Sequence, residues 1–405
     1  MSERSRRLRV AVIAGGWPGD SSHLEAAGRE VDLTYYYSRW LPAAGSTEVP
    51  SLTSATSQAF MPLIKSPRGH LTFVFPGLHK ALDRQRPDVV HVVSEPWGLL
   101  CVQAARWVRA NPESALAFHG CDTLWHHGGA MEQRVRRAIL RFTMTTAAAY
   151  CAENTKALAL ATQNGLPSGS VCERIHTCPR DDAVWRQPEP AERARARTVL
   201  ELDDETLAVG LVGRMVPEKG IMTFLDAAEL LLARGLRAKF FLVGDGPLRD
   251  EVTRRRSAHV VPLGSLVHPH GVLRFMQALD VLACPSRSTS FWEDQGPRAV
   301  LESMMCGGIP AATATGGIPE MLGGRGVLSR SVEPADFADA IADAAVLARN
   351  EDARRDVADW ARSQYSNTAV ARQLVDLWTR LEVREPDDVS SSADRSPRVA
   401  SEREG

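Results

Sequence analysis

Short apolar runs recur along the chain, and each is followed by a turn and then by a stretch with helical spacing. In the first half these runs span 8–14, 87–94, 115–122, 147–152 and 175–178. Near-continuous apolar runs are typical of strands in a parallel sheet, because helices cover both faces of such a sheet. The first half therefore predicts a parallel sheet, with helices over 98–109 and 131–144.

The segment 31–70 cannot be assigned in this way. It combines Tyr35, Tyr36 and Tyr37 with several proline and serine residues, and neither a helical nor a strand period is visible in it. Aromatic side chains favour a core role over a place on a binding surface. We therefore expect core packing there, and a long loop that touches a ligand stays the alternative.

The second half repeats the pattern. Strands are expected over 208–213, 239–248, 260–264 and 280–286, and helices over 298–306, 334–349, 352–363 and 367–381. The stretch 179–205 is rich in proline, arginine and acidic residues and predicts a linker. Strands that alternate with helices on both sides of a linker predict an α/β fold of two doubly wound, Rossmann-like domains that face a cleft. We place these domains at 1–182 and 183–365.

Composition adds limits to this picture. A chain of 405 residues is long enough for two domains, and its formal net charge of −1 gives no field that would attract nucleic acid. Seven scattered cysteines without a Cys-x-x-Cys pair fit a reducing cytoplasm. The apolar run 10–14 is too short for a signal peptide, and no run is long enough for a membrane span. Residues 384–405 predict a disordered tail.

Charged and glycine-rich turns follow several of the predicted strands, where the ligands of open parallel sheets collect. Arg214 and Lys219 leave one strand five residues apart, and two cations beside a helix start suit a diphosphate. Asp294 and Glu302 stand eight apart around the start of another helix, where Glu302 offers a pair of acceptor oxygens. The arrangement indicates a pocket for a polyhydroxylated, negatively charged small molecule.

These two acids, the Cys-Gly-Gly-Ile-Pro that follows and the Gly-Gly-Ile-Pro-Glu that ends at Glu320 resemble the Glu-x7-Glu signature of the retaining glycosyltransferases of family 4. Asp294 stands where that family more often has Glu. The adjacent Glu293 is the alternative for this position. Asp294 is preferred because an amide side chain and then Pro297 follow it, as in one subgroup of the family. The resemblance is strong in the second half and weak in the first.

The resemblance implies the GT-B fold, in which a closing helix, 366–383 here, crosses back to the first domain. It implies transfer of a sugar from a UDP- or GDP-linked donor to a hydroxyl acceptor on a glycolipid, glycan or small glycoside. It also implies retention of the anomeric configuration without a metal or other cofactor. The expected product is a glycoside of unchanged configuration.

The resemblance also assigns roles to residues. Arg214 and Lys219 would grip the donor diphosphate, Asp294 the sugar hydroxyls, and His119 at a strand exit the transferred sugar, and these four are the expected catalytic residues. Glu302 would bind the ribose. Further donor contacts are expected at or beside glycine-rich turns: Gly15, Gly16, Gly213, Gly244, Gly246, Leu263, Gly296, Thr315, Gly316 and Gly317.

Two other functions stay open at this point. A sugar-nucleotide epimerase of the same fold would convert the donor without an acceptor, and a non-catalytic protein would bind the sugar nucleotide without turnover. The helix over 131–144 is basic and amphipathic, so it suits peripheral contact with the inner face of the plasma membrane, or else solvent. No residue pattern indicates a metal site, since His268 and His270 lack a third ligand. The sequence does not predict the oligomeric state.

Overall fold

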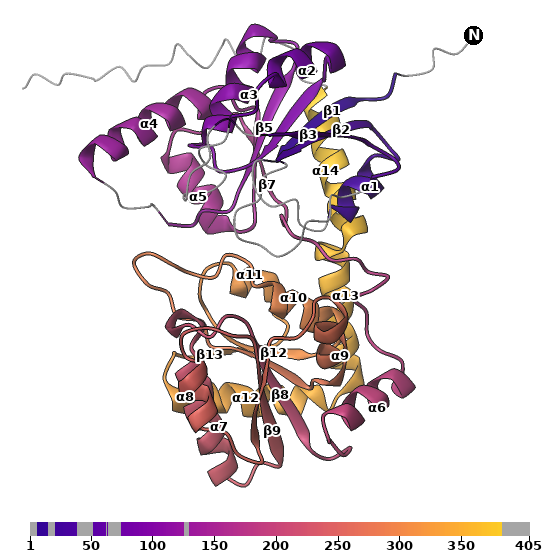
Figure 1. The fold of residues 1–405 in the computed structure, drawn as a ribbon, viewed down its shortest axis with the longest axis vertical. Helices are drawn as coiled ribbons and strands as arrows, with labels where there is room; N and C mark the ends of the chain where they lie inside the picture. The colour runs from indigo at the N-terminus through magenta and orange to yellow at the C-terminus, as the bar shows by residue number, and fades with distance from the viewer. Residues whose placement is uncertain are drawn as a thin grey trace, which may run out of the picture.

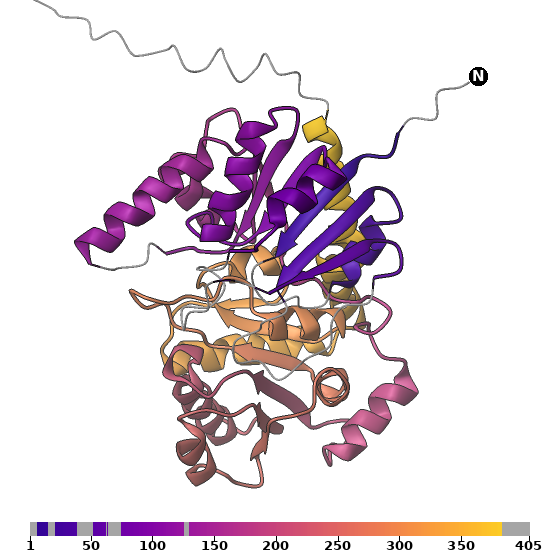
Figure 2. The same cartoon turned by 45° about the horizontal axis from the view of Figure 1, so that its top comes forward.

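The computed structural model describes residues 6–14, 21–38, 52–61, 63, 74–124 and 129–382. These residues form two lobes, each built on a parallel sheet with helices on both sides (Figure 1). The view in Figure 2 shows that helix α14 (Asn367–Glu382), near the end of the chain, lies against the sheet of the first lobe.

The first lobe has seven parallel strands in the order β3-β2-β1-β4-β5-β6-β7. They are β1 (Arg9–Ala14), β2 (Asp32–Ser38), β3 (Thr56–Phe60), β4 (Val89–Val93), β5 (Ala115–Gly120), β6 (Ala149–Ala152) and β7 (Val171–Arg174). The strand order changes direction between β1 and β4. Ligands of open sheets bind beyond the carboxyl ends of the strands at such a point.

Two layers of helices cover this sheet. One face carries α2 (Leu78–Gln85), α3 (Leu99–Ala110), α4 (Ala130–Met144) and α5 (Thr155–Gln163), and the other carries α1 (Ser22–Ala27) and α14. Strand β4 contributes side chains to the packing on both faces of the sheet, because successive side chains of a strand point to opposite faces. Val90 and Val92 pack under α2 and α3, whereas Val89 belongs to the cluster with α14.

The second lobe has six parallel strands in the order β10-β9-β8-β11-β12-β13. They are β8 (Leu207–Val212), β9 (Ala238–Val243), β10 (Val260–Gly264), β11 (Val281–Cys284), β12 (Ile309–Thr313) and β13 (Val327–Ser329). The helices are α6 (Pro190–Val199), η2 (Pro217–Lys219), α7 (Ile221–Ala233), α8 (Arg249–Arg254), α9 (His270–Ala278), α10 (Arg298–Met305), α11 (Ile318–Leu322), α12 (Pro334–Ala348) and α13 (Glu351–Tyr365). One continuous core cluster links this sheet to its helices.

Helix α14 follows α13 in the second lobe and packs into the core of the first. Its Trp378 is fully buried, and the indole Nε1–H donates to His91 Nδ1 in β4 at 3.0 Å. Leu374 and Leu377 pack in the same cluster. Loss of a buried tryptophan from such a core costs about 3–5 kcal/mol, so α14 is a structural part of the first lobe.

The expected α/β architecture of two Rossmann-like sheets is confirmed. Two details of the sequence interpretation are wrong. The last strand of the first sheet is β7 and not 175–178, because an edge strand needs no continuous apolar run and β7 alternates half-buried with exposed positions. The supposed linker 179–205 contains α6, which begins with a capping box between Glu189 and Glu192 and with Pro190 in the first turn.

The unassigned segment 31–70 contributes β2 and β3. Tyr35, Tyr36 and Tyr37 are all buried in β2, as the core interpretation expects. The predicted tail 384–405 lies outside the described residues.

Candidate active site

The loop between β11 and α10 carries the first predicted acid. Lys219 Nζ lies 2.7 Å from Asp294 Oδ1 and 3.0 Å from Oδ2, and the Ser286 hydroxyl also donates to Oδ2. Lys219 follows β8, which neighbours β11 in the sheet, so adjacent strand exits bring the pair together. The Trp292 ring lies 5.1 Å from the ammonium, within the range of a cation–π contact. Asp294 is buried and charge-paired at this site.

The turn after β12 closes against the Asp294 loop. Gly316 has a φ of 53°, and a Cβ on it would lie 1.7 Å from the carbonyl oxygen of Asp294, so only glycine fits there. The Gly317 N–H donates to that same carbonyl at 2.9 Å, and the Thr315 hydroxyl bonds with the Ser288 hydroxyl. The structure thus brings these three predicted residues together with Asp294. Of the two glycine amides, only that of Gly316 has no backbone acceptor among the described residues.

The second predicted acid lies deep in α10. Glu302 Oε1 accepts from Arg180 Nε at 2.8 Å and lies 3.2 Å from His268 Nε2. The side chains of Arg180 and Glu302 are each 5% exposed, so this is a buried ion pair. His268 comes from the segment after β10 and stands at the side of α10. One oxygen of the carboxylate is therefore already held by the protein.

The predicted residues at the exits of β8, β9 and β10 are neighbours in the sheet. Gly213 N–H donates to Val243 O at 2.9 Å, and a Cβ at Gly244 would lie 1.9 Å from Gly213 O, so these two turns are packed backbone to backbone. Gly246 lies in the turn after β9, and Leu263 is half-buried at the end of β10. The Arg214 guanidinium is exposed and has no partner within the described part of the chain.

His119 is the last residue but one of β5 in the first lobe and is buried. Its Nε2 lies 2.8 Å from the carbonyl oxygen of Ile175, so Nε2 must carry the proton, and Nδ1 is left as an acceptor. Burial lowers the pKa of His119 to about 4. The ring is therefore neutral near pH 7, and it can accept a hydrogen bond from a hydroxyl group.

Two family models together cover most of this architecture. The model described as "Glycosyl transferase 4-like domain" matches residues 4–173, and the one described as "Glycosyl transferases group 1" matches residues 206–345. The chain belongs to the GT-B glycosyltransferases. Each lobe of this glycosyltransferase thus has its own match, and the two matched regions contain the two sheets.

Individual relatives agree with this family. Glycogen synthase of Alkalilimnicola ehrlichii is 33% identical over 151 residues, which are 34% of this chain and 30% of the relative. A D-inositol 3-phosphate glycosyltransferase of Acidothermus cellulolyticus is 29% identical over 271 residues, 63% of this chain and 56% of the relative. The matched parts thus span less than two thirds of either relative.

The fold of the glycosyltransferase also has solved counterparts. The crystal structure of Anabaena Alr3699/HepE in complex with UDP superposes with a TM-score of 0.67 at 19% identity, covering 92% of this chain and 100% of that one. At this identity the likeness shows the fold alone.

A cavity of about 70 Å³ lies beside His119 in the first lobe. Its walls include His91, His119 and His176 together with Tyr35 and Trp378. Burial lowers the pKa of each of these three histidines, so these three imidazoles are neutral near pH 7. Such walls suit uncharged hydroxyl groups better than ions.

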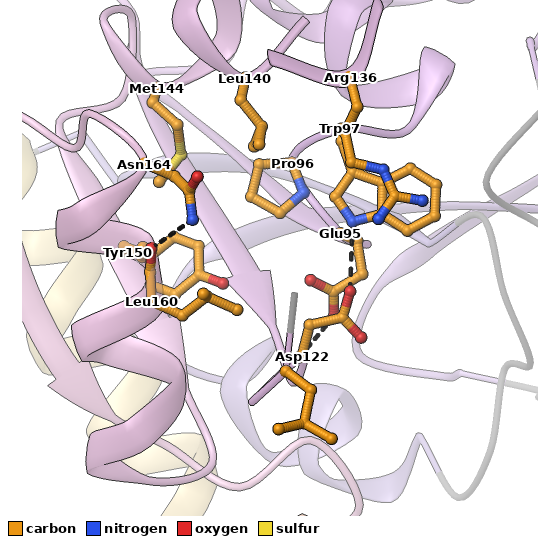
Figure 3. Close-up of a pocket in the computed structure, with 12 residues that line it drawn as sticks. Glu95, Pro96, Trp97, Asp122, Arg136, Leu140, Met144, Tyr150, Leu160 and Asn164 are labelled. Carbon is orange, nitrogen blue, oxygen red and sulfur yellow. Dashed lines mark hydrogen bonds between the residues drawn. The ribbon is translucent and has the colours of Figure 1, made fainter. Parts of the chain in front are cut away.

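A second cavity, of about 30 Å³, lies on the opposite face of the same sheet (Figure 3). Glu95, Asp122 and Trp97 gather at one end of it, and the Trp97 indole donates to Asp122 at 3.2 Å. Burial, together with the nearby charge of Asp122, raises the pKa of Glu95 to about 8. None of the predicted site residues that the structure describes lines this cavity.

The two lobes touch directly beside the predicted site. Lys156 Nζ in α5 lies 2.9 Å from Glu293 Oε2, so Glu293 faces the first lobe while its neighbour Asp294 faces Lys219. A Cβ on Gly296 would lie 2.9 Å from His176 Nε2, which places Gly296 in the interface between the lobes.

Gly15 and Gly16 lie outside the described residues. Ser286, Arg180 and His268 contact the two acids and were not assigned a role from the sequence. Only Ser286 had a usable signal, since it lies two residues after β11, in the loop that leads to Asp294.

Proposed function

We propose that this chain is a retaining glycosyltransferase that moves a sugar from a nucleoside diphosphate donor to a hydroxyl acceptor. The contact between Lys219 and Asp294 carries the proposal, because a phosphate-binding cation and a hydroxyl-binding acid must be adjacent to hold a diphosphate sugar at its reacting bond. The exposed Arg214 supplies a second cation at the same strand exit. The family match supports this assignment independently of the geometry.

The chemistry follows from the charges that develop. When the anomeric carbon–oxygen bond breaks, its electron pair goes to the β-phosphate oxygen and the sugar becomes cationic. Arg214 and Lys219 stabilise the departing diphosphate, and loss of one such preorganised partner typically costs about 3–4 kcal/mol of barrier. The acceptor oxygen attacks on the face that the diphosphate leaves, and its proton passes to the departing phosphate oxygen. This sequence retains the configuration without an enzyme nucleophile.

Asp294 and His119 hold the transferred sugar from opposite lobes. Asp294 accepts hydrogen bonds from sugar hydroxyls and pairs with Lys219, which links the sugar to the leaving group. His119 accepts a further hydroxyl through Nδ1, since its Nε2–H is already bonded to Ile175 O. Because burial lowers the pKa of His119 to about 4, the ring is a weak base near pH 7, and we assign it a binding role and not proton transfer.

The donor and the cofactor requirement are part of the same proposal. Glu302 binds the ribose, and the backbone near Leu263 meets the base. Alr3699/HepE is described in complexes with UDP and with UDP-glucose, which supports a UDP-linked donor, and a GDP-linked donor is the second choice. The reaction requires no metal or other cofactor, because Arg214 and Lys219 supply the positive charge. Activity that survives a chelator would support this point.

The acceptor side is proposed for the first lobe, with contact to a membrane surface. Helix α4 exposes Met131 and Val135 together with Arg134, Arg137 and Arg141, a combination that suits an anionic lipid surface. No helix among the described residues is long and apolar enough to cross a membrane. Sedimentation with anionic vesicles should fall when the three arginines are replaced by glutamine. Unchanged sedimentation would remove the membrane contact from the proposal.

The direct test is turnover. The protein is incubated with UDP- and GDP-sugars and a panel of hydroxyl acceptors, and release of nucleoside diphosphate is measured, with NMR used to read the anomeric configuration of the product. We expect release that depends on an acceptor and is abolished in Arg214→Ala and Lys219→Ala. Conversion of the donor without an acceptor would instead show an epimerase, and binding without turnover a non-catalytic protein.

A further inference from the structure

Arg180 is the residue that holds the proposed ribose-binding acid. Its Nε donates to Glu302 Oε1 at 2.8 Å, and both side chains are 5% exposed. The guanidinium is itself fixed, because NH1 donates to the carbonyl oxygens of Cys178 and Pro179 at 3.2 Å and 3.0 Å. The planar guanidinium therefore fixes the direction in which the carboxylate points.

The two oxygens of Glu302 are not equivalent as a result. Oε1 accepts from Arg180 and also lies 3.2 Å from His268 Nε2. Oε2 has no hydrogen-bond partner within the described ranges, so it remains the oxygen that can accept from a ligand. A carboxylate held by one oxygen presents the other in a single orientation, which is what recognition of a diol requires.

Arg180 also stands where the chain passes between the lobes. Its N–H donates to Tyr365 O at 3.0 Å, and its carbonyl accepts from Asn367 N–H at 2.8 Å, which pairs it with Ser366. The chain crosses between the lobes twice, once after β7 and once between α13 and α14. These two crossing segments are therefore paired with each other at Arg180. Arg180 thus lies at the junction of the two lobes, with its backbone paired to one segment and its side chain bonded to Glu302.

We propose that Arg180 is a positioning residue for the ribose of the donor nucleotide. It holds Glu302 Oε1 so that Oε2 faces the 2′- and 3′-hydroxyls, and it compensates a carboxylate charge that is surrounded by protein. It touches neither the reacting bond nor the phosphates. The inference rests on the proposed function, since it assigns the support of a nucleotide site.

A different result is expected if the ion pair of Arg180 with Glu302 only stabilises the fold. If Arg180 only stabilised the fold, its loss would weaken binding of every nucleotide by the same factor. If it orients Glu302, its loss removes the ribose contact and leaves the base and phosphate contacts. The ratio of affinities for UDP and 2′-deoxy-UDP separates the two cases, because the second ligand lacks one of the hydroxyls.

Calorimetric titration of the 405-residue chain with UDP and 2′-deoxy-UDP tests this inference. The wild-type protein should prefer UDP by roughly 10-fold or more, the range for a hydrogen bond to a charged group. In Arg180→Met the ratio should fall to within about threefold of unity, mainly through loss of UDP affinity. Lys156→Met is the matched control, because it breaks another contact between the lobes, the 2.9 Å pair with Glu293, and should keep the wild-type ratio.

The outcomes are distinct. A folded Arg180→Met protein with the wild-type ratio overturns the inference and leaves the proposed function standing. Wild-type protein that binds neither UDP nor GDP overturns both. If Arg180→Met does not fold, Arg180→Lys decides, because an ammonium can pair with Glu302 but cannot also hold the Cys178 and Pro179 carbonyls in the same geometry. Its ratio should fall at least threefold, and an unchanged ratio overturns the inference.

Discussion

Lys219 donates to both carboxylate oxygens of Asp294, at 2.7 and 3.0 Å, although 75 residues separate the two in the chain. The cation that we assign to the leaving phosphate is thus in contact with the acid that we assign to the sugar. A donor that binds between them must share the ammonium with Asp294. The pair therefore links recognition of the sugar to stabilisation of the leaving group.

Replacement of Lys219 by methionine tests the cation. We expect kcat to fall by about 100- to 1000-fold, because one preorganised positive partner of the leaving phosphate is lost. Lys239→Met is the matched control, since Lys239 is exposed to a similar degree, 21% against 20%, but bonds to Glu201. Initial rates of nucleoside diphosphate release should be unchanged in the control. A Lys219→Met enzyme that keeps its kcat within about threefold would contradict the assigned role.

The register of the acidic motif can be decided by two neighbouring substitutions. Asp294 contacts Lys219, whereas Glu293 contacts Lys156 in the other lobe. We therefore expect Asp294→Asn to reduce kcat/KM for the donor by at least about 100-fold, and Glu293→Gln to reduce it by less than about fivefold. Steady-state kinetics with varied donor concentration measure both. The opposite order would place Glu293 in the first position of the motif.

The sequence was sufficient for the buried central strands and for the turns that follow them, but not for β2, β3 and the edge strand β7. Apolar runs and glycine-rich exits predicted the central strands of both sheets, and the Arg214 to Lys219 turn needed no long-range information because its residues are local. What the sequence could not predict are partners distant in the chain. Arg180 is 122 residues from Glu302, and no periodicity or spacing relates them. Arg180 lies in a stretch rich in proline and arginine, and this composition favoured a linker. The sequence therefore did not indicate the buried ion pair of Arg180 with Glu302.

The close approach of Gly316 to the Asp294 loop predicts a large effect of a single methyl group. In Gly316→Ala the Cβ would lie 1.7 Å from Asp294 O, and φ is 53°. We expect a loss of at least about 2–3 kcal/mol in the free energy of unfolding and a loss of activity as the loop moves. Gly324→Ala is the matched control: its φ is 80° but nothing lies within 4 Å, so it should lose only about 1 kcal/mol. Equal losses in urea titrations would show that the contact with the loop is unimportant.

The buried His119 predicts a specific dependence of stability on pH. Burial lowers its pKa to about 4 in the folded protein, below the value of about 6.5 in an unfolded chain. The unfolded state therefore binds a proton first as the pH falls, so this contribution to the free energy of unfolding is complete above about pH 6.5 and is lost towards pH 4. It amounts to on the order of 3 kcal/mol.

In His119→Gln the amide can still donate to Ile175 O but does not titrate, so the free energy of unfolding should decline less steeply over this window. His91 and His176, whose pKa values burial also lowers, remain in the variant and preserve part of the slope. Urea titrations at a series of pH values between 4 and 7 measure the difference. Identical slopes of the free energy of unfolding against pH in both proteins would mean that His119 is not held neutral in β5. That result would contradict its assignment as a hydroxyl acceptor.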